Sequence, residues 1–396
     1  MVRYRRVSCR SRRRLPSYCF LLLFVVGGQA ALAADWADGG ESPVVGASDV
    51  VEHTWTIGRP PAGEHDRIQV HRYKGEGEAQ AALLYLPGTN MNGEVAIASE
   101  DHNLWIFLAR RGVVVYTLDY RTHTVSSGPL EDASFMRPWT LTAFVDDARE
   151  ALLLVRQEES GLDVFVAGFS RGVWLGYGLV GTEEAGSIAG FVALDGGFKG
   201  HRPQDRYDLE RAQKAFEKSG NWASDVAGSL GWERRDRLMR AASAAPDGPA
   251  LGADFDSVGE QVASILQGAW RPGGLANPHD GVSRPQILAR LLADYDRYYP
   301  SVQNIESAAI ADYDDHPTLA VDDRWGELEL PVLYFGATNM GATWVLDGVY
   351  SAAKSGSRDV TLNLLENYGH LDVLVGERAR EDVFEPLLSW LDERTK

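Results

Sequence analysis

The stretch LDVFVAGFSRGVWLGYGLV, residues 162–180, places one serine between two apolar segments. Its first half is apolar enough for a buried strand, and its second half has apolar residues at helical spacing. Ser170 stands at the junction, with Gly168 and Gly172 two positions to either side. A G-x-S-x-G pattern between a strand and a helix is typical of a tight turn that exposes a nucleophilic serine. The sequence therefore predicts that Ser170 is a nucleophile; the alternative is a serine that only caps the helix.

Strands and helices alternate along much of the chain around this turn. Two segments with alternating polar and apolar residues, 50–57 and 66–73, predict an antiparallel pair of strands. Further strands are expected within residues 81–90, 113–120, 163–168, 188–197, 330–338 and 359–366. Helices are expected within residues 102–112, 142–157, 171–181, 341–356 and 381–395. This alternation favours an α/β protein with a mostly parallel central sheet and helices on both faces.

The alternation stops between residues 198 and 321, where the sequence is richer in charged residues. Helices are expected there within residues 207–220, 234–245, 258–270 and 285–299. The simplest organisation is one α/β domain, built from residues 34–197 and 322–396. Residues 198–321 would form a helical cap, inserted after the sixth expected strand.

The N-terminal residues have the features of an export signal. Residues 1–18 are basic without an acidic residue, and an apolar run of about 15 residues ends in the small-residue sequence Ala31-Leu32-Ala33. We expect a signal peptide over residues 1–33, through the Sec or the twin-arginine route, and a periplasmic or secreted protein. The alternative, a membrane anchor, is less favoured because the run is short for a span.

Removal of residues 1–33 would change both charge and cysteine content. Seven arginines would leave, which takes the net charge from −17 to −24, and a surface this acidic disfavours nucleic acid and anionic membranes as partners. Cys9 and Cys19 would leave as well, so no thiol nucleophile or disulfide is expected. The chain also lacks an H-E-x-x-H motif and a Walker-type glycine loop, so neither a metal nor a cofactor is expected.

A serine nucleophile needs a base and donors for the oxyanion. Of the nine histidines, His370 lies shortly after the last expected strand, where ligands of open α/β sheets bind. The backbone N–H groups of Arg171 and of Thr89, in the turn PGTN after an earlier strand, are the candidate oxyanion donors. Asp119, which ends another strand, is expected to hold loops together, with Arg121 as a partner.

These motifs together resemble those of the α/β-hydrolase superfamily. The resemblance rests on the runs LPGTN, LDY, GFSRG, ALDGG, LPVLYFGA and YGHLD, and it covers about residues 50–200 and 328–396. It implies the α/β-hydrolase fold, serine hydrolase chemistry and a cap, at residues 198–321, that roofs the substrate pocket.

The sequence leaves open which residue is the acidic partner of His370, the third member of the expected catalytic triad. The family most often carries the acid after the penultimate strand, where this chain has Asn339. Three candidates therefore remain: Asp195 at the end of the preceding strand, Asp347 in the following helix, or Asn339 as an uncharged orienting group. We favour Asp195.

The function expected from these observations is hydrolysis of carboxylic esters by an exported serine hydrolase. The partner would be a small-molecule or lipid-like ester, and the oligomeric state stays open. Two alternatives remain: a serine peptidase or amidase of the same fold, and a catalytically silent binding protein. The absence of a carboxylate near position 339 is the feature that favours the silent protein.

Overall fold

The computed structural model describes residues 35–183, 187–202, 207–252, 254–269, 282–312 and 319–395. The expected signal peptide, residues 1–33, lies outside these ranges. In the described part of the chain, no helix is both long and apolar enough to cross a membrane.

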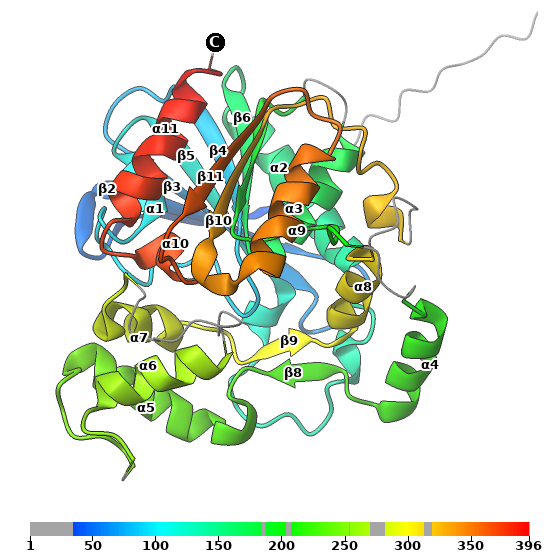
Figure 1. The fold of residues 1–396 in the computed structure, drawn as a ribbon. Helices are drawn as coiled ribbons and strands as arrows, with labels where there is room; N and C mark the ends of the chain where they lie inside the picture. Colours follow the sequence, from blue (N-terminus) through cyan, green and yellow to red (C-terminus); the bar gives the residue numbers. More distant parts are fainter. Residues whose placement is uncertain are drawn as a thin grey trace, which may run out of the picture. The chain divides into compact units, whose positions relative to one another are not determined.

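A nine-stranded sheet forms the centre of the described residues, in the order β1-β2-β3-β5-β4-β6-β7-β10-β11 (Figure 1). Its strands are β1 (Ala37–Val44), β2 (Ala47–Gly58), β3 (Arg67–Gly75), β4 (Ala81–Leu86), β5 (Val113–Asp119), β6 (Asp163–Phe169), β7 (Gly190–Leu194), β10 (Val332–Ala337) and β11 (Val360–Leu365). The pairs β1–β2, β2–β3 and β3–β5 are antiparallel, and the pairs from β5 to β11 are parallel. The mostly parallel sheet expected from the sequence is therefore confirmed.

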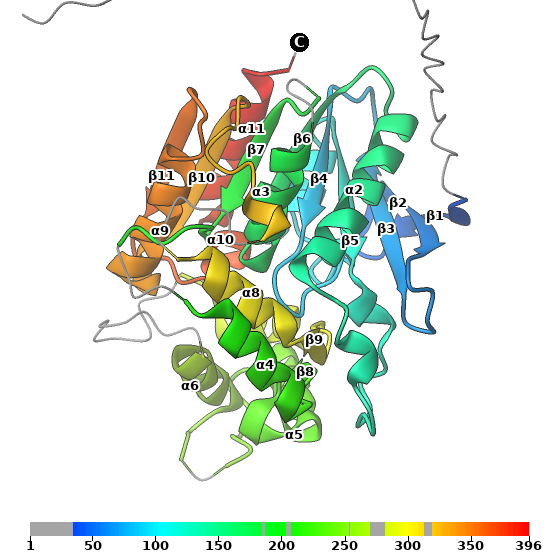
Figure 2. The ribbon, with the colours of Figure 1, turned by 90° about the vertical axis from the view of Figure 1, so that its right-hand side faces the viewer.

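Helices cover both faces of the sheet and create two apolar layers (Figures 1 and 2). On one face lie α1 (Leu104–Ala109) and α11 (Glu385–Asp392), and on the other α2 (Leu141–Glu158), α3 (Arg171–Thr182) and α9 (Ala342–Ala353). Strands β4 and β5 are buried along their whole length. Burial on both faces explains why these strands are continuous apolar runs rather than alternating ones.

Strand β1 was not expected from the sequence. Its residues ADGGESPV contain two glycines and a proline, which are unfavourable in strands. It forms nevertheless because it is an exposed edge strand that pairs only with β2. The strand expected to be the sixth, Gly190–Leu194, is consequently the seventh, and the helical insertion follows β7.

The segment between β7 and β10 is mainly helical. It contains α4 (Leu209–Ser219), α5 (Trp232–Ala244), α6 (Val258–Ala269), α7 (Pro285–Ala293) and α8 (Val302–Ile310). It also holds a small antiparallel sheet of β8 (Ala223–Asp225) and β9 (Tyr298–Pro300). The expected helix over residues 285–299 is wrong beyond Ala293, because the tyrosines that follow pair with β8 instead.

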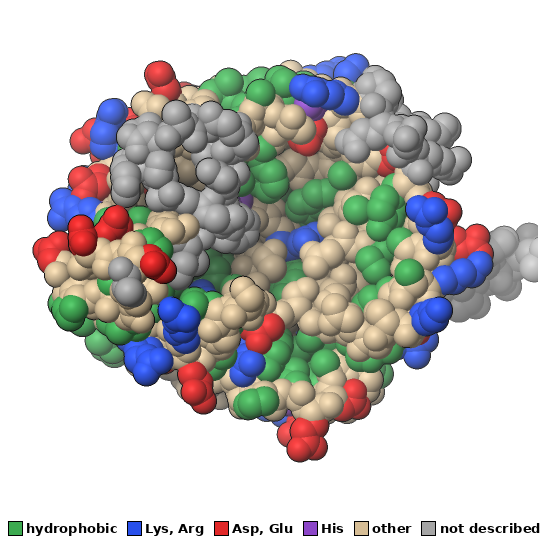
Figure 3. All heavy atoms as spheres, turned by 60° about the horizontal axis from the view of Figure 1, so that its bottom comes forward, with side chains coloured by type: hydrophobic (Ala, Val, Ile, Leu, Met, Phe, Trp, Pro, Cys, Tyr) green, Lys and Arg blue, Asp and Glu red, His purple; other side chains and the backbone are tan. Residues whose placement is uncertain are grey.

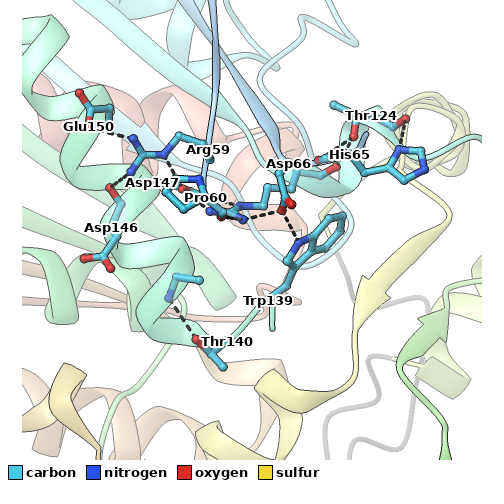
Figure 4. Close-up of polar contacts among 12 residues, drawn as sticks. Arg59, Pro60, His65, Asp66, Thr124, Trp139, Thr140, Asp146, Asp147 and Glu150 are labelled. Atoms are coloured by element: carbon cyan, nitrogen blue, oxygen red, sulfur yellow. Dashed lines mark hydrogen bonds and ion pairs between the residues drawn. The ribbon is translucent and has the colours of Figure 1, made fainter. Parts of the chain in front are cut away.

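A buried ionic network ties the β2–β3 connection to α2 (Figure 4). The Arg121 guanidinium donates to both carboxylate oxygens of Asp147, at 2.7 and 2.8 Å, and to Asp66 Oδ1 at 2.7 Å. Arg59 donates to Asp147 from the other side at 2.8 Å, and the Trp139 indole donates to Asp66 at 2.9 Å. Asp119 was expected to pair with Arg121, and this expectation is wrong because Asp147 and Asp66 occupy the guanidinium.

Candidate active site

Ser170 occupies the tight turn between β6 and α3. Its φ is 54° and its ψ is −115°, a strained combination for a residue with a side chain. A Cβ on Gly168 would lie 2.2 Å from the Gly172 carbonyl oxygen, and a Cβ on Gly172 would lie 1.9 Å from the Leu86 carbonyl oxygen. Both positions therefore require glycine, and the turn has the geometry of a nucleophile elbow.

The neighbouring strand β7 ends beside β6 in direct register. Phe169 pairs with Leu194, and the Ser170 N–H donates to the Leu194 carbonyl at 3.1 Å. Asp195 follows as the next residue, with φ 45° and no solvent exposure. Parallel pairing thus brings the carboxylate of Asp195 and the hydroxyl of Ser170 to the same edge of the sheet.

His370 reaches this edge from the loop that follows β11. Its Nδ1 lies 2.5 Å from Oδ2 of Asp195, and the side chain is almost fully buried. The Phe169 ring stacks on the imidazole at 4.6 Å between centroids, and the Trp344 ring meets it edge-on at 5.4 Å. These contacts fix the plane of the imidazole between the strand that carries Ser170 and the helix α9.

The second oxygen of the Asp195 carboxylate is also occupied. Oδ1 accepts from the Ala337 N–H at 2.8 Å and from the Trp344 indole N–H at 3.1 Å. Two donors on Oδ1 leave Oδ2 to face the imidazole. A carboxylate in this position can hold Nδ1 protonated and stabilise the imidazolium.

The other candidates for the acid have different partners. Asp347 Oδ1 accepts from the backbone N–H of His201 at 2.8 Å and lies 2.6 Å from the Nδ1 of its ring. Asn339 Nδ2 donates to the Asn367 carbonyl at 2.8 Å. The structure therefore brings Asp195 to His370 and places Asp347 and Asn339 in other contacts.

The loop after β4 lies against the nucleophile turn. A Cβ built on Gly88 would be 3.2 Å from the Ser170 Cβ, which places the peptide of Thr89 beside the serine. At the far end of this loop, the Gly93 N–H donates to Asp119 Oδ1 at 2.6 Å, and its carbonyl accepts from Thr117 Oγ1 at 2.7 Å. The far end of the loop that carries Thr89 is thus anchored to β5.

Asp119 is held by a histidine that the sequence did not single out. His71 Nε2 lies 2.9 Å from Asp119 Oδ2, and His71 Nδ1 lies 2.7 Å from Glu52 Oε1. The two carboxylates raise the pKa of His71 to about 10 despite its burial. In the sequence, His71 is one polar position of an alternating strand, and only its register opposite β5 brings it to Asp119.

Residues 294–296 of the insertion contact the loop after β4. The Asp296 N–H donates to the Asn90 carbonyl at 2.8 Å, and Asn90 Nδ2 donates to the Asp296 carbonyl at 2.9 Å. Asn92 Nδ2 donates to the Asp294 carbonyl at 2.8 Å. The Asp296 carboxylate lies 2.9 Å from His123 Nδ1, and the surrounding carboxylates raise the pKa of this histidine to about 9. Residues 294–296 therefore sit at the carboxyl edge of the sheet, next to the candidate site.

An apolar pocket of about 50 Å³ lies beside the loop after β4. Its lining combines that loop, α1, α7 and the helix α10 (Asp372–Val375) that follows His370. The lining residues are Tyr85, Met91, Glu94, Ala96, Ile97, His102, Asn103, Leu104, Trp105, Leu291, Leu374 and Val375. Across the described residues, no three His, Cys, Asp or Glu side chains are arranged to hold a metal ion.

Solved structures show which fold this is. No protein-family model matches the chain, and no curated protein matches it at the sequence level. A Sulfolobus solfataricus protein assigned as a candidate lipase is 23% identical with a TM-score of 0.72, over 91% of this chain and 99% of that one. A thermostable carboxyl esterase from Bacillus coagulans is 11% identical with a TM-score of 0.50, over 87% and 99%. The chain has the α/β-hydrolase fold.

Proposed function

We propose that the protein hydrolyses carboxylic esters through a triad of Ser170, His370 and Asp195. The observation that carries this proposal is the contact of 2.5 Å between His370 Nδ1 and Asp195 Oδ2 beside a serine at φ 54°. An oriented imidazole and a strained serine at the carboxyl edge of one sheet support this proposal, because acyl transfer requires a nucleophile and a base on the same side of the substrate.

The chemistry follows from these positions. Ser170 Oγ attacks the ester carbonyl while His370 Nε2 takes its proton, and the Asp195 carboxylate stabilises the imidazolium that forms. The N–H groups of Thr89 and Arg171 stabilise the oxyanion of the tetrahedral intermediate. His370 then gives the proton to the leaving alcohol, and an acyl-enzyme forms on Ser170. Water, activated by His370, attacks this acyl-enzyme in the second half of the reaction.

Two further points support an ester rather than an amide as the substrate. The solved structures with the same fold include one described as a candidate lipase and one described as a carboxyl esterase. An alcohol also leaves more readily than an amine.

We also propose that the protein is exported, with residues 1–33 removed as a signal peptide. The basic start, the apolar run and the Ala31-Leu32-Ala33 site support this proposal. N-terminal sequencing of the protein recovered outside the cytoplasm tests it, with Ala34 expected as the first residue. An N-terminus upstream of the apolar run would contradict it.

Covalent labelling tests the proposed reaction most directly. A fluorophosphonate probe should label the wild-type protein and fail to label Ser170→Ala, while the surface variant Ser126→Ala keeps full labelling. A panel of p-nitrophenyl esters and aminoacyl anilides then separates esterase from peptidase activity. Lack of labelling in a folded wild-type protein would contradict the proposal, and preferred cleavage of anilides would replace it by the peptidase alternative.

A further inference from the structure

The residue after the nucleophile, Arg171, carries its side chain toward the insertion. Its Nη2 donates to Asn304 Oδ1 at 2.8 Å, and its Nη1 makes a longer contact of 3.3 Å with the Gln303 carbonyl, both on α8. The guanidinium carbon lies 5.8 Å from the centre of the Trp174 ring and 5.9 Å from that of Tyr299. The cation is therefore surrounded by neutral oxygens and aromatic faces.

Two other arginines whose side chains are largely buried have carboxylate partners. Arg121 donates to Asp147, and Arg297 donates to Asp225 at 2.9 Å. Arg171 forms no ion pair with any acidic side chain in the ranges that the structure describes. Burial accordingly lowers the pKa of Arg171, whereas carboxylates raise the pKa of Arg121.

Two residues need comment here: a nearby carboxylate, Glu306, and a second arginine that forms no ion pair, Arg235. Glu306, on the same helix α8, acts on the guanidinium only through space, because its carboxylate accepts from the Leu141 N–H at 2.6 Å. Arg235 also forms no ion pair with a carboxylate of the described residues, but it is only 5% exposed and lies within the insertion. Arg171 is the more accessible of the two and the one adjacent to the candidate nucleophile.

A partly buried cation that forms no ion pair costs free energy, since it loses water and the more distant carboxylate of Glu306 compensates only in part. The guanidinium has five N–H donors, and the contacts above use two of them. The remaining donors can form the paired hydrogen bonds that carboxylates and phosphates accept from arginine. The face that includes the insertion is hollowed (Figure 3).

We infer that the Arg171 guanidinium binds an anionic group of the substrate, so that the preferred substrates are esters that also carry a carboxylate or a phosphate. The inference rests on the proposed function, because it places this anion next to the carbonyl that Ser170 attacks. Half-esters of dicarboxylic acids carry the anion on the acyl side. Acylated glycerol phosphates carry it on the alcohol side, and the two sources share the chemistry that Arg171 recognises.

Matched pairs of anionic and neutral esters test the inference through a ratio of kcat/KM values. Ethyl hydrogen adipate is compared with ethyl hexanoate, and acetylated glycerol phosphate with monoacetin. The ratio is the kcat/KM of the anionic ester divided by that of the neutral ester. It should be at least about 10 for one pair in the wild-type protein, as expected of charge-assisted hydrogen bonds. It should fall to about 1 in Arg171→Met, stay partly raised in Arg171→Lys, and keep its wild-type value in the surface variant Arg137→Met.

The possible results separate this inference from the proposed function. Ratios near 1 for both pairs in an active wild-type protein, or an unchanged ratio in Arg171→Met, would overturn the inference alone. An equal loss for neutral and anionic esters in Arg171→Met would also overturn it, since the guanidinium would then act on the reaction and not on the substrate anion. Absence of turnover and of fluorophosphonate labelling would overturn both.

If Arg171→Met does not fold, a competition experiment with the wild-type protein replaces it. Glutarate or inorganic phosphate should inhibit the turnover of ethyl hexanoate competitively. No inhibition by either anion overturns the inference.

Discussion

Ser170 and Asp195 occupy equivalent positions on two neighbouring parallel strands. Each follows directly after a residue of the registered pair Phe169–Leu194, and each has a positive φ, 54° and 45°. Both strands therefore end at the same level of the sheet, and the chain turns directly after each of them. Both side chains consequently lie at one edge of the sheet. This equivalence explains how the proposed acid, Asp195, can stand at the end of β7 instead of β10, where the resemblance to the superfamily would place it.

Replacement of the acid tests this arrangement. Asp195→Asn should lower kcat on p-nitrophenyl acetate by about 10³- to 10⁴-fold, because the neutral amide neither stabilises the imidazolium nor favours the required tautomer. Asp347→Asn should change kcat less than about threefold, since Asp347 contacts His201 and not His370. Full activity in Asp195→Asn, with loss in Asp347→Asn, would reverse the assignment.

The glycine after the nucleophile should be intolerant of any side chain. Gly172→Ala would place its Cβ 1.9 Å from the Leu86 carbonyl oxygen and 2.8 Å from that of Pro87, both of which are backbone atoms that cannot move aside. We expect a loss of at least about 3 kcal/mol in the free energy of unfolding. Chemical denaturation measures it. Gly128→Ala is the control, since its nearest contact would be an ordinary 3.4 Å, and an equal loss in both variants would contradict the steric explanation.

The network around Arg121 should contribute strongly to stability. Arg121→Met would leave the buried carboxylates of Asp147 and Asp66 short of their main cationic partner. We expect a loss of about 3–5 kcal/mol in the free energy of unfolding, as for other buried pairs that lose one member. Arg324→Met removes an exposed pair with Glu327 and should cost less than about 1 kcal/mol. Similar small losses in both variants would show that the buried network is not essential.

Stability should decline in alkaline solution through His123. Its pKa rises from 6.5 to about 9, against desolvation, because Asp296, Asp119 and Glu94 face the ring. Between these pKa values the folded protein keeps a proton that the unfolded chain releases, so the stabilisation is complete below the unfolded pKa and is lost as pH rises through about 9. The size is about 1–2 kcal/mol after allowance for solvent screening.

The variant His123→Gln isolates this contribution. The free energy of unfolding should differ less in the variant than in the wild-type protein when it is measured once below pH 6.5 and once above pH 9. His71, whose pKa is raised to about 10 by Asp119 and Glu52, remains in both proteins and accounts for the residual slope. An unchanged slope would mean that His123 is neutral in the folded protein.

Much of the fold could be predicted because apolar runs reveal buried parallel strands. Strands β4 and β10 are apolar throughout, β5 and β6 are apolar except near their ends, and the G-x-S-x-G turn marks the end of β6. Strand β1 could not be predicted, because an exposed edge strand has no apolar pattern. The end of α7 could not be predicted, because contacts with distant loops, and not local helical propensity, determine the conformation of residues 294–300.

The candidate site divides in the same way. Ser170, His370 and Asp195 could be proposed because each follows a recognisable strand and because the family resemblance gave the chain order. Glu52 and His71 could not, because their role depends on the register between β2, β3 and β5, which no local pattern encodes. The contacts of Arg171 with Gln303 and Asn304, and the absence of an ion pair with a described carboxylate, likewise depend on which side chains the insertion brings to α3.

The reciprocal backbone and side-chain contacts between Asn90 and Asp296 join the insertion to the loop after β4. An outward movement of residues 294–297 that keeps these hydrogen bonds would also move the turn that contains Thr89. Thr89 is the proposed second donor for the oxyanion, so the position of the insertion and the geometry of the proposed reaction centre would be coupled.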